Sequence, residues 1–281
     1  MFRLKSIYRR LYVAAIACVA LASNITGVQA DIAADFAKFS AGSKQTIDHS
    51  AWNKLLQTYV VPGADGLNRV RYAAFKAEGQ TALKAYIKTL EAVDDASLDK
   101  PEQFAFWANL YNAKTIDIVL DKYPVKSIKD ISLGGGVVAA ITGGPWKANV
   151  LNVGGKALSL DSIEHGILRG TFKDPRVHFS VNCASVGCPN LANEAFTGAN
   201  LEAKLDAGAK AYVNHPRGFK VENGALKASS IYDWFKADFG GPEGVLKHAR
   251  KYASGTLKQE LESITAIDSF GYDWSLNDAG K

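Results

Sequence analysis

Cysteine is scarce in this chain. Its 281 residues include three cysteines, Cys18, Cys183 and Cys188, and Cys18 lies in an apolar N-terminal run that we expect to be removed. The two others are too few for the disulfide framework that stabilises small secreted domains. The fold must therefore rest on a hydrophobic core, for which 47% hydrophobic residues are an ordinary content.

Other patterns are missing as well. No segment after residue 30 has about 18 consecutive apolar residues, so we expect no membrane span once the N-terminal run is removed. The chain has no HExxH or CxxC motif, so the sequence does not predict a metal site or a cofactor as its first interpretation.

The first 30 residues have the pattern of a secretory signal peptide. A basic start precedes an apolar run at residues 11–22, and Val28-Gln29-Ala30 provides the small residues needed for cleavage. We expect residues 1–30 to be a signal peptide and residues 31–281 a single globular domain, periplasmic or extracellular. Lipid modification at Cys18 is the alternative, although the residues before Cys18 match that signal poorly.

Most of the positive charge belongs to this N-terminal segment. Four of the 33 basic residues and none of the 28 acidic residues lie in it, and they account for most of the net charge of +5. The remaining chain is nearly neutral, so we expect no nucleic-acid partner. The partner that remains is an unknown small molecule or peptide.

Helical patterns outnumber strand patterns. The longest predicted helix, residues 101–123, begins at a proline and stops before Pro124, and apolar residues nearly encircle it. Gly154-Gly155 and Asn223-Gly224 are typical turns of β-hairpins, here within residues 149–160 and 219–228. Residues 177–181 alternate as a strand does, and residues 161–169 are expected to be helical. These patterns predict an α+β fold, mainly helical, with short β-hairpins in a single domain.

Thiol, imidazole and carboxylate groups lie close together in the sequence, which is typical of a nucleophilic or a metal site. We expect Cys183 to be a nucleophile whose pKa a nearby imidazolium lowers, with His165 or His178 as the base. Glu164 or an asparagine, Asn109 or Asn112, would orient that base. In a continuous strand, His178 and Cys183 would point to opposite faces, which would favour His165.

The same residues allow two other interpretations. A disulfide between Cys183 and Cys188 would close a loop of six residues and stabilise the fold by about 2 kcal/mol. Export to an oxidising compartment favours this bond. A zinc site would use His165, His178, Glu164 and Cys183, although their spacing matches no common zinc motif.

Further polar residues are candidates for binding a substrate. Arg169 would hold an anionic group or pair with a surface carboxylate. Asn109, Asn112 and Asn182 would either line a pocket or fix the backbone of a loop. We expect Asn109, Glu164, His165, His178 and Cys183 to surround one cavity.

Two Tyr-Asp-Trp triplets begin at Tyr232 and Tyr272. Such a density of aromatic residues is typical of a core whose polar tips are hydrogen-bonded, and less often of a surface on which a carbohydrate stacks.

Several segments together resemble the domain of unknown function 547 family. They are residues 106–113 (FWANLYNA), 163–169 (IEHGILR), 174–183 (DPRVHFSVNC), 188–189 (CP) and 272–277 (YDWSLN), which follow one another in the order typical of the family. The resemblance implies no particular activity, because the family has none established. It implies that the following residues occupy characteristic motif positions: Asn109, Asn112, Glu164, His165, Arg169, His178, Asn182, Cys183 and Cys188.

The sequence therefore predicts an exported, cysteine-dependent hydrolase or acyltransferase of unknown substrate. The alternatives are a non-catalytic binding domain with a Cys183–Cys188 disulfide and a domain with a zinc site.

Overall fold

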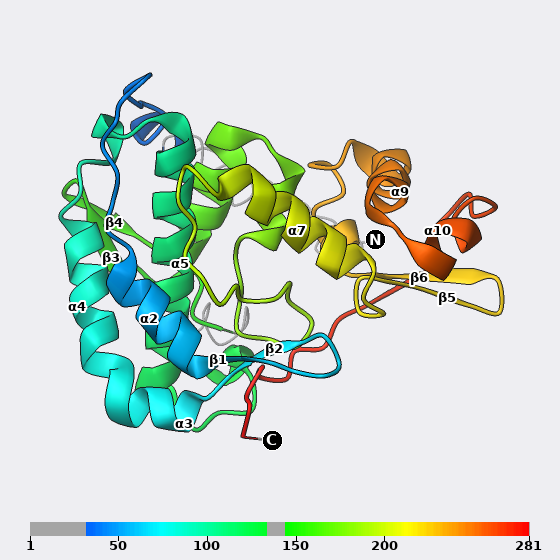
Figure 1. Cartoon of the computed structure of the whole chain (residues 1–281), viewed down its shortest axis with the longest axis horizontal. Coiled ribbons are helices and arrows are strands. Elements are labelled where there is room, and N and C mark those ends of the chain that lie inside the picture. Colours follow the sequence, from blue (N-terminus) through cyan, green and yellow to red (C-terminus); the bar gives the residue numbers. More distant parts are fainter. Residues whose placement is uncertain (1–31, 134–143, 281) are drawn as a thin grey trace, which may run out of the picture.

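The computed structural model describes residues 32–133 and 144–280. The predicted signal peptide, residues 1–30, and the expected new N-terminus at Asp31 lie outside this range. The described part is mainly helical with short β-strands, which confirms the predicted α+β class (Figure 1).

The described residues contain α-helices and β-strands, together with π and 3-10 segments. The α-helices are α2 (Ser50–Tyr59), α3 (Tyr72–Ala74), α4 (Gln80–Glu91), α5 (Lys100–Lys122), α7 (Leu201–Val213), α8 (Ile231–Trp234), α9 (Gly241–Tyr252) and α10 (Gly255–Glu260). The strands are β1 (Val60–Pro62), β2 (Asn68–Val70), β3 (Leu151–Val153), β4 (Lys156–Leu158), β5 (Phe219–Glu222), β6 (Ala225–Ser229) and β7 (Ser269–Gly271). The π segments are Phe75–Gly79 and Ser162–Phe172, and the 3-10 segments are Asp95–Ser97, Ile128–Asp130 and Pro175–Phe179.

Helix α5 is the central element, as its pattern predicts. The Asp99 side chain caps its first turn by accepting the backbone N–H of Glu102, and the helix ends just before Pro124. Most of its side chains are buried, on all sides of the helix. Figure 1 shows α5 inside the larger part of the molecule, with α2 and α4 beside it.

Both predicted hairpins are confirmed. Strands β3 and β4 pair antiparallel around Gly154 and Gly155, which both have positive φ. Strands β5 and β6 pair antiparallel around Asn223 and Gly224, which also have positive φ, and β7 adds to β6 in parallel. Glycine and asparagine tolerate this left-handed conformation, so the sequence marks both turns.

The predicted strand at residues 177–181 is wrong. Residues Pro175–Phe179 form a 3-10 helix, which the Asp174 side chain caps by accepting the backbone N–H of Arg176. The alternation was misleading because the polar residues His178 and Ser180 are as buried as their apolar neighbours. The helix expected at residues 161–169 exists, but Ser162–Phe172 has π geometry.

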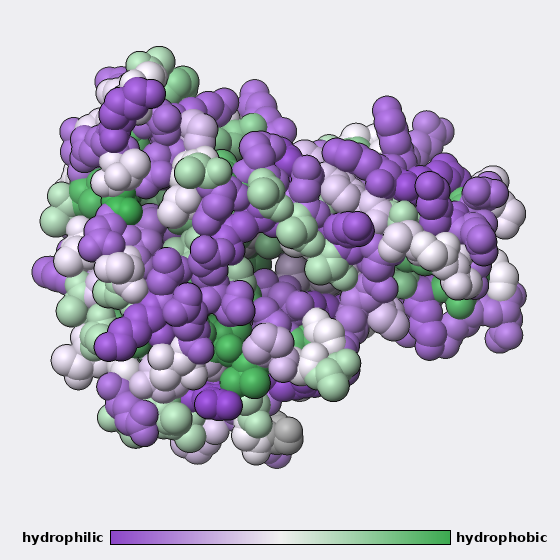
Figure 2. All heavy atoms as spheres, in the orientation of Figure 1, coloured by the Kyte–Doolittle hydropathy of each residue, from purple (hydrophilic) through white to green (hydrophobic). Residues whose placement is uncertain are grey.

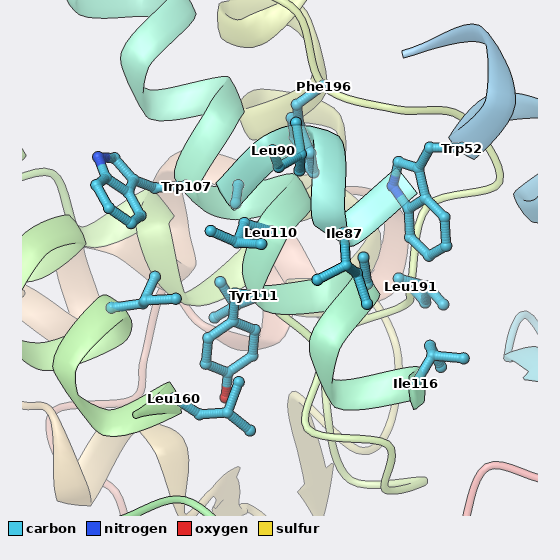
Figure 3. Close-up of a cluster of buried hydrophobic side chains, with 14 of the residues drawn as sticks. Trp52, Ile87, Leu90, Trp107, Leu110, Tyr111, Ile116, Leu160, Leu191 and Phe196 are labelled. Carbon is cyan, nitrogen blue, oxygen red and sulfur yellow. The ribbon is translucent and has the colours of Figure 1, made fainter. Parts of the chain in front are cut away.

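Two clusters of buried side chains make up the core. The larger cluster surrounds α5 and includes Trp52, Trp107 and Tyr111, whose arrangement Figure 3 shows. The smaller cluster joins α7 and α9 to the β5–β6–β7 sheet and includes Tyr212 and Tyr232. Figure 1 shows α9, α10 and β5–β6 as a narrower part that extends from the main body.

The surface is largely polar on the face that Figure 2 shows, with small and separate apolar areas. Within the described ranges, no helix combines the length and the hydropathy that a bilayer crossing needs.

Candidate functional site

A cavity of about 180 Å³ lies where the two clusters of the core meet. One side is formed by α5, the π segment Ser162–Phe172 and the 3-10 helix Pro175–Phe179. The other side is formed by α8 and the C-terminal residues Tyr272 and Trp274. It is lined by Tyr111, Trp146, Asp161, Glu164, His165, His178, Val181, Cys183, Cys188, Pro189, Ile231, Trp234, Phe235, Tyr272 and Trp274.

The structure brings most of the predicted site residues together. Glu164, His165, His178 and Cys183 all line the cavity, and Cys188 lies beside them. Asn109 does not. The π geometry of Ser162–Phe172 positions Glu164 and His165, and π turns are frequent at functional sites.

The three asparagines are occupied elsewhere. Asn109 binds the backbone N–H and C=O of Phe196, at 3.0 and 2.8 Å. Asn112 accepts the N–H of Asn182 and donates to the C=O of Ser180, both at 2.8 Å.

Asn182 continues this network. Its side chain donates to the C=O of Pro189 at 2.7 Å and accepts the N–H of Ala184 at 2.8 Å. None of the three asparagines lines the cavity, so in this structure they fix loop backbone and do not form a pocket wall.

Arg169 is bound by a carboxylate of the chain itself. Its Nε and Nη2 donate to the two carboxylate oxygens of Asp238 at 2.6 and 2.9 Å. It does not line the cavity. Of the two roles expected for Arg169, the pairing with a carboxylate is therefore the one that the structure contains.

His178 forms a buried pair with the same carboxylate. Its Nε2 lies 2.7 Å from Asp238 Oδ2, and its ring stacks on Phe235 with 4.2 Å between centroids. Burial lowers the pKa of His178, although the hydrogen bond to Asp238 opposes this, so the imidazole is neutral near pH 7. For Asp238, burial would raise the pKa, but hydrogen bonds from His178 and Arg169 outweigh it and hold that pKa well below its usual range.

The tautomers of both histidines follow from these contacts. Since Asp238 is ionised, the Nε2 of His178 carries the proton and its Nδ1 keeps a lone pair. A neutral His165 has the same tautomer for a different reason, because Arg169 can only donate to its Nδ1, at 3.2 Å. The Nε2 of a neutral His165 therefore carries the proton, and this nitrogen lies 3.8 Å from Asp161 Oδ1.

Glu164 is held by a buried tyrosine. The Tyr111 hydroxyl of α5 donates to Glu164 Oε2 at 2.9 Å. Burial and then the Glu164 charge raise the pKa of Tyr111 well above its usual value, so this hydroxyl keeps its proton. Asp161, which also lines the cavity, has a raised pKa because it is buried and lies near Glu164.

The two cysteines are adjacent free thiols in this structure. The backbone N–H of Cys183 lies 2.9 Å from Cys188 Sγ. Cys183 Sγ lies 3.2 Å from both the Ser185 Oγ and the Tyr272 hydroxyl.

The pKa values of the two thiols are not shifted in the way that we expected. The hydrogen bond to Cys188 and burial raise the pKa of the Cys183 thiol well above its usual value. Burial acts against ionisation of Cys188 too, but hydrogen bonds from the Cys183 thiol, Tyr272 and the Cys183 backbone lower its pKa. The expectation that an imidazolium lowers the pKa of Cys183 is wrong, because the described residues place no imidazole within hydrogen-bond distance of this sulfur.

The zinc interpretation lacks a ligand set. In residues 32–133 and 144–280, no three side chains of histidine, cysteine, aspartate or glutamate are grouped so that they could hold a metal ion. His178 is instead bound to Asp238, and Glu164 to Tyr111.

Sequence reasoning missed Asp238 and most of the aromatic wall. Asp238 follows His178 by 60 residues, and no motif links the two. Of the Tyr-Asp-Trp triplets, Tyr232 is a core residue as expected, whereas Trp234, Tyr272 and Trp274 line the cavity. The triplet itself was the available signal, since Trp and Tyr often combine an apolar contact with a polar one at a site.

Comparison with known proteins finds a family model that matches part of the chain. The model described as "Protein of unknown function, DUF547" matches residues 96–213, which confirms the resemblance over that segment. The match includes α5, the π segment and both cysteines, but not Trp234, Asp238 or Tyr272. No curated protein and no solved structure matches the chain significantly.

Proposed function

We propose that this chain, whose residues 96–213 match the DUF547 family model, is a cysteine-dependent hydrolase or acyltransferase. One observation carries the proposal. A thiol, an imidazole with a carboxylate partner and a second carboxylate come from separate segments and line the same cavity. This combination is typical of enzymes that form a covalent acyl intermediate.

Cys183 is the proposed nucleophile. It is the more exposed of the two thiols, and the hydroxyls of Ser185 and Tyr272 lie 3.2 Å from its sulfur. Because its pKa is raised, it rests as a protonated thiol and needs a base when it attacks.

His178 is the proposed base. The lone pair on its Nδ1 is available, while Asp238 binds its Nε2 and would stabilise the imidazolium that forms. His165 is less suited, because Arg169 already occupies its Nδ1. Contact between Cys183 and His178 would form only when substrate is bound, as catalytic hydrogen bonds often do.

The reaction would then proceed in two steps. The Cys183 sulfur would attack a carbonyl carbon while its proton passes to His178, and the Ser185 and Tyr272 hydroxyls would donate to the oxyanion. The imidazolium would return the proton to the leaving group. Water would complete a hydrolysis, and an amine or alcohol would complete an acyl transfer.

A generic acyl donor tests this proposal. Incubation with p-nitrophenyl acetate should release a burst of nitrophenol and leave one acetyl group on Cys183, which peptide mass spectrometry locates. Asp238→Asn should slow the acetylation about tenfold or more, because it removes the charge that orients and stabilises His178. Asp233→Asn is the matched control, since Asp233 is paired with Lys236 and does not line the cavity.

Two outcomes would contradict the proposal. An acetyl group on Cys188 alone, or none on either thiol, excludes Cys183 as the nucleophile. A native protein with no free thiol, in which Cys183→Ser and Cys188→Ser each cost about 2 kcal/mol of stability, would instead support the binding domain with a structural disulfide.

A further inference from the structure

One wall of the cavity is a continuous group of aromatic rings. The ring centroids are 5.7 Å apart for Trp234 and Trp274, 5.0 Å for Trp234 and Tyr272, and 4.6 Å for Tyr272 and Trp274. Trp234 is 47% exposed, which is unusual for a residue of this size. An indole left open beside a cavity is available for a ligand.

The polar lining of the cavity is acidic. Asp161 and Glu164 carry carboxylates, and no lysine or arginine belongs to the lining that the described residues form. The nearest guanidinium, that of Arg169, is neutralised by Asp238. His178 is neutral near pH 7 and does not balance the two carboxylates, so the imidazole beside them is that of His165, 3.8 Å from Asp161 Oδ1 and 3.9 Å from Glu164 Oε1.

The aromatic wall already accepts one cation. Lys129 Nζ lies over the Trp274 ring, 5.0 Å from its centroid. The face of an indole ring attracts positive charge through its quadrupole, and the attraction is stronger where water is excluded.

We propose that this cavity binds an alkylammonium group, which would lie between the rings of Trp234 and Trp274 and the carboxylates of Asp161 and Glu164. An anionic group would instead meet two carboxylates, and no lysine or arginine of the described residues lines the cavity. A volume of about 180 Å³ suits a small headgroup. If the proposed function holds, this ammonium group belongs to its substrate; that assignment rests on the proposed function, whereas the binding itself does not.

A comparison of charged and neutral probes tests the proposal. Choline and ethanolamine would be titrated into the mature protein at pH 7.5, with calorimetry and tryptophan fluorescence as readouts. The probe 3,3-dimethylbutan-1-ol has nearly the shape of choline without its charge. We expect both amines to bind and the neutral alcohol to bind about tenfold more weakly or not at all. A preference for choline over ethanolamine would assign the site to quaternary amines, and the reverse to primary amines.

Matched variants locate the site. Trp234→Leu and Glu164→Gln should each weaken amine binding about tenfold, and the Gln side chain can still accept the Tyr111 hydrogen bond. Phe39→Leu and Glu222→Gln are the controls, because both residues are exposed and outside the cavity. Thermal unfolding would show that each variant is folded.

Equal binding of choline and its neutral analogue would overturn the proposal, as would binding of neutral sugars in preference to amines. Absence of binding by either amine would overturn it as well. The titrations would be repeated with Cys183→Ser. Amine binding that persists in this variant separates the two proposals, because it holds even if the thiol proves to have no catalytic role.

Discussion

The protein is expected to lose stability between pH 7.5 and pH 4, and replacement of His248 by phenylalanine should make this loss about 3 kcal/mol smaller. His248 packs against the smaller cluster of the core, since its ring stacks on Phe179 with 5.4 Å between ring centroids. Its Nε2 is buried and has no hydrogen-bond partner among the described residues. Burial is therefore the main cause that lowers the pKa of His248 to about 4.

The sign of this effect follows from proton binding. An unfolded histidine has a pKa near 6.5, so below that pH the unfolded chain binds a proton that the folded protein does not. The stability contributed by neutral His248 is complete above pH 6.5. It is lost progressively as the pH falls to about 4. Phenylalanine cannot be protonated, so the variant should keep this stability in acid.

Other groups also contribute to the pH dependence of the wild type. Burial lowers the pKa values of His49, His178 and His215, which act in the same direction as His248. Burial raises the pKa of Asp95 to about 6 and raises that of Asp161, and these two carboxyl groups act in the opposite direction. A difference between variant and wild type cancels these shared contributions.

Urea unfolding at pH 7.5, 6, 5 and 4 measures the effect. His248→Leu is a second variant, in case a phenyl ring does not fit. His215→Gln is the control, because His215 is less buried and already hydrogen-bonded to the Asp65 C=O, so its removal should change the pH dependence less. If the wild type and both His248 variants lose stability in parallel, His248 is not the source of the acid sensitivity.

The sequence predicted the elements whose local signals are strong. Helix α5 has a proline at its start and another just after its end, and the hairpins have Gly154-Gly155 and Asn223-Gly224 at their turns. These signals act over a few residues and need no knowledge of the rest of the fold.

The strand prediction for residues 177–181 was wrong because of tertiary contacts. The alternation rule assumes that polar residues face water, yet Asp238 binds His178, and the Val177 C=O accepts the Ser180 hydroxyl. Both polar side chains are therefore buried with partners, and the pattern no longer reports the local structure.

The residues of the candidate site also fall into a group that the sequence predicted and a group that it did not. Glu164, His165, His178 and Cys183 are close in sequence and reactive by type, so their convergence was predictable. The partner of His178 and the rings of Trp234 and Trp274 come from distant segments, and only the fold places them at the cavity. The state of the thiols was not predictable either, because it depends on Tyr272, which lies 89 residues after Cys183.

Asn112→Ala is expected to lower the free energy of unfolding by about 2 to 6 kcal/mol. The Asn112 side chain is 3% exposed and satisfies two backbone groups, the Ser180 C=O and the Asn182 N–H. Alanine would leave both groups buried without a partner, and each unsatisfied group costs about 1–3 kcal/mol. The segment that loses its support leads directly to Cys183, so the change should also reach the cavity.

Two controls separate stability from the effect on the cavity. Asn109→Ala removes the same kind of double backbone contact from the same helix, but at Phe196, which does not line the cavity. It should cost a similar free energy of unfolding without altering the rate at which iodoacetamide labels Cys183. Asn152→Ala, on an exposed position of β3, should change neither quantity by much. Urea unfolding and iodoacetamide labelling rates would be measured on the three variants. A loss of less than about 1 kcal/mol in the free energy of unfolding of Asn112→Ala would contradict this account. So would an Asn109→Ala variant in which the labelling of Cys183 changes as much as it does in Asn112→Ala. In either case α5 would not be the support that holds the thiol segment against the cavity.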